Sequence, residues 1–175
     1  MGKPQSHLNF WLMSSSFRLR DFLSPRKNIL KEVGIKTGFH VLDYGCGPGE
    51  YIVPLTKLVG KSGKIYSLDS SHLAIKSVKK KIIKKHLSNV ETIHSDCKTG
   101  LPDSSLNIIL LYDIFHDLSH PHDVLKELHR VLKSHGILSV TDHHLNENEL
   151  VTGLSDSGLF RLSTKGIKTY SFLKR

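Results

Sequence analysis

Short apolar runs alternate along this chain with longer segments whose apolar residues recur every three or four positions. Runs of this kind predict buried strands, and the longer segments predict helices with one apolar face. The predicted strands span residues 39–45, 64–69, 90–96, 106–113 and 137–143, and the predicted helices span residues 25–35, 48–59, 71–86, 122–133 and 146–158. Gly136 is expected to end the helix that precedes the last of these strands. Residues 159–175 predict a hairpin that turns near Lys165 and Gly166.

Strands that alternate with amphipathic helices predict an α/β domain in which a mostly parallel sheet has helices on both faces. The closing hairpin brings the expected sheet to seven strands and adds antiparallel pairing at one edge. A length of 175 residues suits one such domain, expected over residues 27–175. Residues 1–26, where aromatic residues interleave with arginines, are interpreted as a helical segment that forms a lid over the cofactor or an amphipathic surface helix. Ordinary packing against the domain is the alternative. Ligands of parallel sheets bind beyond the carboxyl ends of the strands, so the residues that follow each strand are the candidates for function.

A glycine-rich segment, GCGPG at residues 45–49, follows the first predicted strand. A dinucleotide-binding fingerprint would place a third glycine at position 50, where this chain has Glu50. Glycines permit a positive φ and let a ligand approach the backbone closely. Asp43 lies at the end of the strand and Glu50 at the predicted start of the next helix, so two carboxylates flank the loop. They would repel a pyrophosphate and attract a cationic ligand such as S-adenosylmethionine, which disfavours a nicotinamide oxidoreductase.

Two further acids follow the next two strands. Asp69 ends the second strand, where a carboxylate can accept hydrogen bonds from both hydroxyls of a ribose. This feature suits nicotinamide and adenosylmethionine proteins equally. Asp96, followed by Cys97, ends the third strand and is positioned to accept a hydrogen bond from an adenine amino group. The two acids therefore predict a nucleoside-binding edge of the sheet.

At this point the chain resembles the class I S-adenosylmethionine-dependent methyltransferases, in particular the type 11 group with its ubiquinone- and menaquinone-biosynthesis-like enzymes. The resemblance covers residues 27–175 and rests on VLDYGCGPG, SLD, SDC, LPDSSLNIILLYDIFHDL and VLKELHRVLKSHGIL. It implies a Rossmann-like methyltransferase fold, with S-adenosylmethionine as cofactor and S-adenosylhomocysteine as product. The cofactor-binding residues that it implies are Asp43, Tyr44, Gly45, Gly47, Gly49, Asp69, Ser70, Asp96, Cys97 and Tyr112. The chain departs from the family pattern at Asn107, Ser134 and His135, where the family usually has aspartate, proline and glycine.

Methyl transfer from a sulfonium needs alignment of the acceptor, and it needs a general base only when the acceptor must lose a proton. The candidates past the fourth and fifth strands are Asp113, His116, Asp117, Asp142, His143 and His144. His116 is the preferred base because its loop should face the methyl group, and Asp113 and His143 are the other predicted catalytic residues. For each of them, solvation or a local hydrogen bond is the alternative interpretation.

The histidines also raise the question of a metal. Imidazole and carboxylate donors suited to zinc are offered by His116, His120, His122, Asp142, His143 and His144. No pair of them has a diagnostic spacing such as H-E-x-x-H, so no functional metal is predicted. The only two cysteines, Cys46 and Cys97, imply no disulfide framework, and Cys46 is expected to pack within its loop. No apolar run is long enough to span a membrane, and the lack of a disulfide framework fits a reducing cytosol, so the chain is expected to be cytoplasmic.

The net charge of +9 leaves the acceptor open. Much of this charge comes from lysines at residues 71–86, where a solvated helix face and a nucleic-acid surface are both consistent with the pattern. A small-molecule or lipid-precursor methyltransferase is the leading hypothesis. The alternatives are an RNA or protein methyltransferase, and a catalytically silent module that binds S-adenosylmethionine and acts with a partner. The sequence leaves the oligomeric state open.

Overall fold

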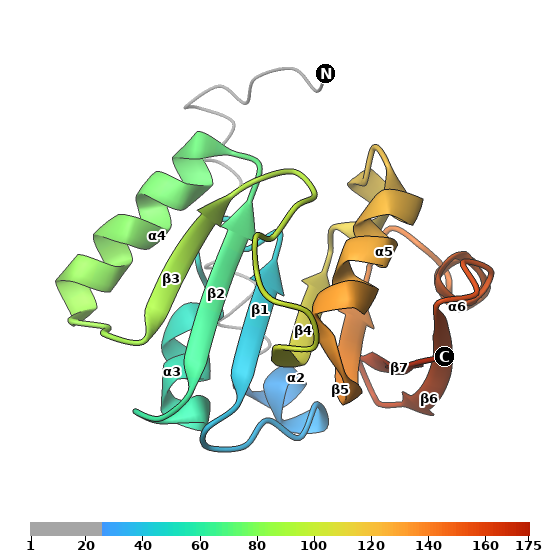
Figure 1. Ribbon diagram of the computed structural model, residues 1–175, viewed down its shortest axis with the longest axis horizontal. Coiled ribbons are helices and arrows are strands. Elements are labelled where there is room, and N and C mark those ends of the chain that lie inside the picture. The colour runs from blue at the N-terminus through green and yellow to red at the C-terminus, as the bar shows by residue number, and fades with distance from the viewer. Residues whose placement is uncertain (1–25) are drawn as a thin grey trace.

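The computed structural model describes residues 26–175 (Figure 1). Its strands are β1 His40–Tyr44, β2 Lys64–Asp69, β3 Val90–His94, β4 Leu106–Tyr112, β5 Leu132–Thr141, β6 Phe160–Lys165 and β7 Tyr170–Lys174. They form one sheet in the order β3-β2-β1-β4-β5-β7-β6. Strands β1 to β5 run parallel, whereas β7 is antiparallel to both β5 and β6. The predicted seven-stranded sheet with its antiparallel hairpin is therefore confirmed.

Helices cover both faces of this sheet. They are α2 Arg26–Glu32, α3 Ile52–Val59, α4 His72–Lys85, α5 Pro121–Val131 and α6 Glu147–Ser155, with a short 3-10 helix, η1, at Phe115–Asp117. Apolar residues of α2, α3 and α4 pack in one buried cluster, and those of α5 and α6 pack in another. Strand order reverses between β1 and β4, so the crevice expected in such folds lies at the carboxyl ends of these two strands.

The predicted lid segment, residues 1–26, falls outside the described residues except for Arg26, which begins α2. None of the helices in residues 26–175 is long and apolar enough to cross a membrane. The departures from the family pattern at Asn107, Ser134 and His135 lie in the first halves of β4 and β5. They are therefore remote from the carboxyl ends of the strands.

The helix after the glycine loop begins later than predicted, at Ile52 rather than at Pro48. Gly47 and Gly49 have φ angles of 52° and 78°, which are left-handed and incompatible with a right-handed helix. Glu50 consequently belongs to the loop and not to the helix. Pro54 is the third residue of α3, near the first turn, where a proline is tolerated.

Gly136 does not end a helix, and that prediction was wrong. Helix α5 ends at Val131 and β5 begins at the next residue, so Gly136 lies inside the strand. A Cβ at this glycine would lie 2.6 Å from the Cδ1 of Leu132 and 3.1 Å from the carbonyl oxygen of Asn107. The glycine therefore permits close packing beside an irregularity, since the pairing of β4 with β5 shifts register between Leu106 and Ile108.

Four parallel strands end slightly earlier than predicted, at Tyr44, His94, Tyr112 and Thr141. The candidate residues at 96, 97, 113, 142 and 143 therefore stand in the loops just beyond the sheet. The predicted short helix at 146–158 is observed as α6, and the hairpin turns at residues 166–169. Asn146 and Glu149 form a reciprocal capping box that fixes the start of α6.

Candidate active site

The glycine loop after β1 is held against β2 by its own backbone. The amides of Gly45 and Cys46 both donate to the carbonyl oxygen of Leu68, at 2.9 Å each. The amide of Gly47 donates to the Oδ2 of Asp69 at 2.8 Å, and the amide of Gly49 donates to the carbonyl of Cys46 at 2.9 Å. These bonds give the loop a single tight path between the carboxyl ends of β1 and β2.

The three glycines of this loop differ in what surrounds them. A Cβ at Gly45 would lie 2.8 Å from the Cγ1 of Ile114, and one at Gly49 would lie 2.5 Å from the Cδ1 of Ile52. A Cβ at Gly47 would meet no described atom within 4 Å. Gly45 and Gly49 are therefore required by protein packing, whereas Gly47 presents open backbone on which a ligand can rest.

Asp69 links the loop to the start of α4. Its Oδ2 accepts from the Gly47 amide, and its Oδ1 accepts from the Ser71 amide, at 2.8 Å each. Burial raises the pKa of the Asp69 carboxyl, and these two amides oppose that effect by stabilising the carboxylate. Ser70 is exposed beside it, and its carbonyl lies 3.0 Å from the Nε2 of His94. Both predicted ribose-edge residues thus lie at the crevice.

Glu50 is not a bare negative charge. The Nζ of Lys81, on α4, lies 3.3 Å from the Oε1 of Glu50 and donates to the carbonyl of Gly49 at 2.6 Å. Both side chains are largely buried, with 25% and 19% of their surface exposed. The argument that Glu50 repels a phosphate is therefore weakened by a cation that the sequence analysis did not pair with it.

Other carboxylates at the same end of the sheet provide the negative charge that the sequence analysis attributed to Glu50. A carboxylate stands at or just beyond the carboxyl end of each of the five parallel strands, and these residues are Asp43, Asp69, Asp96, Asp113 and Asp142. Because the strands are parallel, all five lie at the same edge of the sheet. This edge favours a cationic ligand over a pyrophosphate without help from Glu50.

The two predicted tyrosines are buried. Tyr44 donates its hydroxyl to the carbonyl of Asp96 at 2.8 Å, and the hydroxyl of Tyr112 lies 2.9 Å from the Oγ of Ser139. Burial raises the pKa of both phenols, and they are only 3% and 6% exposed. Both hydroxyls therefore bond to protein groups, and Tyr44 positions the loop that carries Asp96.

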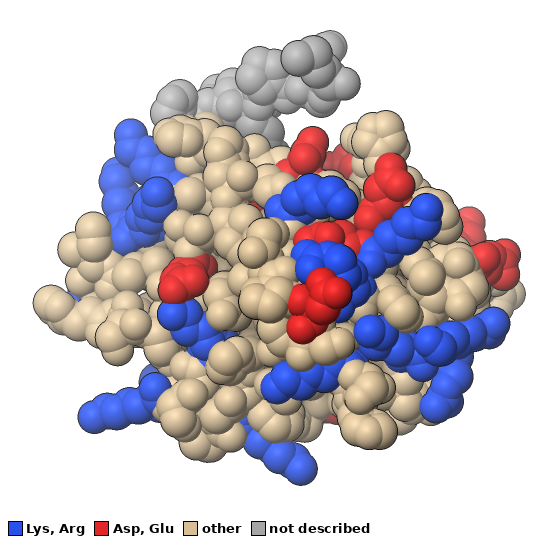
Figure 2. Space-filling view, viewed as in Figure 1, with Lys and Arg blue, Asp and Glu red and all other residues tan. Residues whose placement is uncertain are grey.

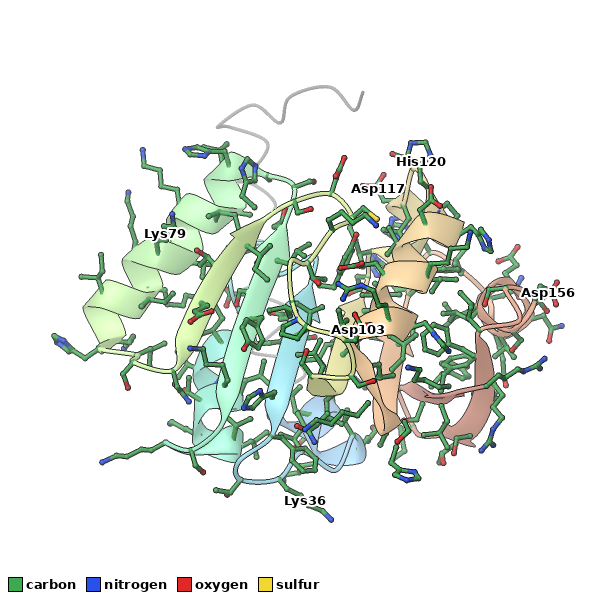
Figure 3. All side chains as sticks on the ribbon, viewed as in Figure 1. Lys36, Lys79, Asp103, Asp117, His120 and Asp156 are labelled. Atoms are coloured by element: carbon green, nitrogen blue, oxygen red, sulfur yellow. The ribbon has the colours of Figure 1, made fainter. Side chains whose placement is uncertain are left out.

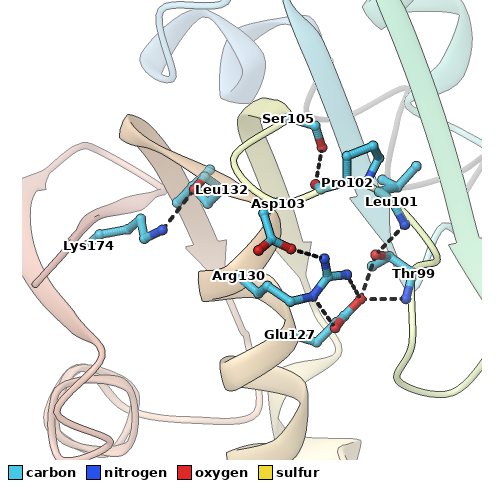
Figure 4. Close-up of polar contacts among 9 residues, drawn as sticks. All are labelled: Thr99, Leu101, Pro102, Asp103, Ser105, Glu127, Arg130, Leu132 and Lys174. Atoms are coloured by element: carbon cyan, nitrogen blue, oxygen red, sulfur yellow. Dashed lines mark hydrogen bonds and ion pairs between the residues drawn. The ribbon is translucent and has the colours of Figure 1, made fainter.

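Asp96 is exposed and Cys97 is half-buried in the loop between β3 and β4. Farther along, this loop is fastened to α5 by a polar network that the sequence analysis missed (Figure 4). Glu127 accepts from the amide and hydroxyl of Thr99, at 2.8 and 2.6 Å, and from the guanidinium of Arg130 at 2.7 Å. The network fastens the loop between β3 and β4 to α5, and its signal in the sequence is an acid on the apolar side of a helix.

The preferred base, His116, is bound to a buried carboxylate. Its Nδ1 lies 2.9 and 2.8 Å from the two oxygens of Asp142, whose side chain is fully buried. The backbone amides of His116 and His144 donate to the same carboxylate, at 3.1 and 3.0 Å. Burial alone would raise the pKa of Asp142, but these hydrogen bonds outweigh it and lower the pKa. An ionised carboxylate at this distance favours the tautomer of His116 that carries the proton on Nδ1, and in that tautomer Nε2 is an acceptor.

The other predicted pair is also formed. The Nδ1 of His143 lies 2.8 Å from the Oδ1 of Asp113, and Asp113 has a φ of 53°, a strained conformation for a residue with a side chain. His143 is 56% exposed, against 28% for His116. The ring of His144 lies between the two other imidazoles, with centroid distances of 4.1 and 4.0 Å and ring planes tilted by 43° and 42°. The structure thus brings together all three predicted catalytic residues.

Not every residue considered for metal binding or catalysis belongs to the cluster formed by Asp113, His116, Asp142, His143 and His144. Asp117 and His120 lie near the same end of the molecule (Figure 3), but His120 precedes α5 and neither is bonded to the cluster by a described contact. Donor atoms of Asp113, Asp142 and His143 do lie within 4.8 Å of one another. The hydrogen bonds described above already account for these three side chains.

Burial raises the pKa of the Cys46 thiol, and this cysteine is 5% exposed within its loop. A buried thiol of this kind packs and does not act as a nucleophile. The sequence-based expectation that Cys46 packs is therefore confirmed.

The sequence pattern of the methyltransferase domain family matches residues 35–165 of this chain. A demethylmenaquinone methyltransferase of Geobacillus stearothermophilus is 32% identical over 126 residues, which cover 71% of this chain and 54% of that protein. The chain spans about half the length of the curated relatives it matches.

Among solved structures, a SAM dependent methyltransferase from Aquifex aeolicus matches with a TM-score of 0.78 and 31% identity, covering 89% of this chain and 91% of that chain. A chain from the complex between the Haloferax volcanii Trm112 methyltransferase activator and a methyltransferase matches with a TM-score of 0.75 and 16% identity, covering 95% of this chain and 81% of that chain. The second likeness concerns the fold alone.

Proposed function

This chain belongs to the class I S-adenosylmethionine-dependent methyltransferases, and from that premise we propose that it methylates a small-molecule or lipid-precursor acceptor of the phenol or hydroquinone type. The observation that carries the acceptor class is the His116–Asp142 pair, since a base is needed only where the acceptor must lose a proton. The names of the demethylmenaquinone methyltransferases among its relatives support a ring acceptor.

The residues at the carboxyl edge of the sheet fit the cofactor. The open backbone at Gly47 offers a platform, Asp69 would accept from the ribose, and Asp96 would accept from the adenine amino group. The five strand-end carboxylates suit the ammonium and sulfonium of S-adenosylmethionine. When bound, this cofactor supplies an activated methyl group that is lost to a nucleophile by in-line displacement.

The part of His116 is to remove a proton. Because Asp142 retains the proton on Nδ1, Nε2 can take the hydroxyl proton of the acceptor as the new bond to the methyl carbon forms. The imidazolium so formed is stabilised by the ionised Asp142 beside it. The proton then leaves His116 to solvent, and the group displaced from the methyl carbon would be the neutral thioether of S-adenosylhomocysteine. Asp113 orients His143 on the other side of His144, where these residues would line the acceptor side of the crevice.

The test is a calorimetric titration of the full chain with S-adenosylmethionine, S-adenosylhomocysteine and NAD side by side, followed by turnover of a matched pair of acceptors. We expect the first two ligands to bind and NAD not to bind. An alkylated hydroquinone should be methylated, and its fully O-methylated analogue, which has no proton to lose, should not. Binding of NAD in place of the sulfonium would overturn the cofactor, and equal turnover of both acceptors would overturn the role of the base.

The alternatives make different predictions in the same experiment. A silent module would bind the cofactor tightly but methylate no acceptor, including proteins or RNA. An RNA methyltransferase would transfer the methyl group to RNA, and its RNA affinity would fall steeply with salt.

A further inference from the structure

The outward side of α4 is the most cationic surface of any helix in the described part of the chain. The helix contains six lysines, and residues 70–90, which include it, contain no aspartate or glutamate. The exposed lysines are Lys76, Lys79, Lys80, Lys84 and Lys85, which we call the α4 lysine face. Figure 2 shows lysine side chains gathered over α4 at the upper left, and Figure 3 labels Lys79 on this helix. The methyltransferase site makes no use of these side chains.

Within residues 26–175, none of these five lysines forms an ion pair with a carboxylate. The sixth, Lys81, is different because it bonds to Gly49 and Glu50 of the glycine loop. The inner side of α4 is occupied by Ala74, Ile75 and Val78, which are buried against the sheet. The lysines are therefore not needed to hold the helix, and their charge is left for an anionic surface.

An apolar side chain lies within the lysine face. Ile83 is 74% exposed, although it sits between lysines on a helix whose apolar residues are otherwise turned inward. No arginine, asparagine, glutamine or aromatic residue other than His72 occurs on α4. Base recognition relies on such side chains, through stacking and hydrogen bonds. A cationic helix with an exposed aliphatic residue instead matches the interface of an anionic bilayer.

We propose that the α4 lysine face, with Ile83, docks this enzyme onto an anionic lipid bilayer. The choice of a bilayer rests in part on the proposed function, because a lipid-precursor acceptor would reside at a membrane. Placement supports the link: Ser71 caps α4 only two residues after Asp69, so the first turn of the helix borders the cofactor end of the sheet. The lysine face runs from Lys76, in the second turn, to Lys85 at the far end of α4, so docking through it would lay α4 along the membrane with the cofactor end of the sheet at one end of the contact.

The experiment is sedimentation of the full chain with vesicles of phosphatidylglycerol and phosphatidylcholine, and with vesicles of phosphatidylcholine alone. We expect binding only to the anionic vesicles, weakening between about 0.1 M and about 0.5 M salt. A lysine near an anionic leaflet contributes about a fivefold factor to partitioning, so K76E/K79E/K80E should lower the partition coefficient about a hundredfold or more. Ile83→Ser should weaken vesicle binding severalfold and leave any binding to RNA unchanged.

The matched control is K36E/K61E/K126E, which lowers the net charge from +9 to +3 as the α4 variant does but changes exposed lysines outside α4. It should lose much less vesicle binding. Equal loss in both variants, absence of binding to anionic vesicles, or α4-dependent binding to RNA alone would each overturn the proposal. Titration of the α4 variant with S-adenosylmethionine should match the wild type, which separates a failure of docking from a failure of the proposed function.

Discussion

His116 and Asp142 are separated by 26 positions in the sequence, yet the imidazole Nδ1 of one lies 2.8 Å from the Oδ2 of the other. The contact is possible because η1 follows β4 and Asp142 follows β5, and these two strands are parallel neighbours. Asp142 also accepts two backbone amides, so its position is set by the loops themselves. A buried carboxylate fixed in this way can impose one tautomer on the imidazole.

Replacement of Asp142 by asparagine should therefore impair catalysis more than binding. The amide keeps the shape of the carboxylate but cannot stabilise an imidazolium, and its NH2 group favours the wrong tautomer of His116. We expect kcat to fall about 10²- to 10⁴-fold, while the Kd for S-adenosylmethionine changes little. Steady-state kinetics over a range of pH and a cofactor titration would measure the two effects. Asp156→Asn, at an exposed acid after α6, is the control. An unchanged kcat in the Asp142 variant would remove the pair from the mechanism.

Substitutions at Gly47 and Gly49, two glycines of the same loop, should separate an effect on packing from an effect on ligand binding. Gly49→Ala adds a methyl group 2.5 Å from Ile52 and 2.9 Å from Val78, at a φ of 78°. It should lower the free energy of unfolding by about 2–5 kcal/mol, from backbone strain together with overpacking. Gly47→Ala meets no neighbour and should cost only about 1–2 kcal/mol. Its methyl group would instead occupy the platform proposed for the cofactor, and the Kd should rise at least about tenfold. Urea unfolding measures the free energy of unfolding, and calorimetry measures the Kd for S-adenosylmethionine. A wild-type Kd in Gly47→Ala would contradict the proposal that the cofactor rests on Gly47.

The sheet was predictable because its signals are local. β2 has the bounds expected from its apolar run, and α4, predicted over residues 71–86 from the spacing of its apolar residues, spans His72–Lys85. The predicted helix end at Gly136 was wrong because glycine occurs both at helix ends and at places where the backbone packs closely. A glycine in this sequence position is typical of a helix end. In the structure, the absence of a Cβ at Gly136 lets the side chain of Leu132 and the backbone of β4 pack against it. This is a tertiary contact, which a local sequence pattern does not reveal.

The sequence could predict which residues belong to the candidate site, but it could not predict which of them contact one another. The rule that strand ends carry function selected Asp113, His116 and His143, but only the parallel pairing of β4 with β5 decides which imidazole meets which carboxylate. The partner of Glu50 could not be predicted either, since this contact also depends on the tertiary fold. Lys81 lies 31 positions away, on a helix whose other lysines face solvent.

This hidden partner changes what is expected of Glu50. Since Lys81 offsets its charge, Glu50→Gln should alter the Kd for S-adenosylmethionine less than about threefold and should not admit NAD. Asp69→Asn should act differently, because an amide cannot accept from both Gly47 and Ser71. The lost hydrogen bond to a charged acceptor should weaken cofactor binding at least about tenfold. Side-by-side titrations of the two variants decide the matter. If Glu50→Gln binds NAD, then the charge of Glu50 is what excludes the pyrophosphate of NAD from the wild-type site.

Acid should loosen the attachment of the loop between β3 and β4 to α5, because that attachment depends on Glu127. The guanidinium of Arg130, together with the hydroxyl and amide of Thr99, lowers the pKa of the Glu127 carboxyl from 4.5 to about 2, against the opposing effect of burial. A carboxyl whose pKa is lower in the folded state stabilises the fold at pH values above its unfolded pKa, and this contribution disappears as the pH falls from about 5 to about 2. The contribution at neutral pH is on the order of 3 kcal/mol.

Glu127→Gln should accordingly lower the free energy of unfolding at pH 7 by about 2–4 kcal/mol and flatten its dependence on pH below about 5. Asp103→Asn is a matched control on the same guanidinium, because Asp103 is 75% exposed and should contribute less than about 1 kcal/mol. Urea unfolding at a series of pH values measures both variants. If Glu127→Gln retains the acid sensitivity of the wild type, the loss of stability in acid must come from other carboxylates, and Asp142, whose pKa is also lowered, is the next to replace.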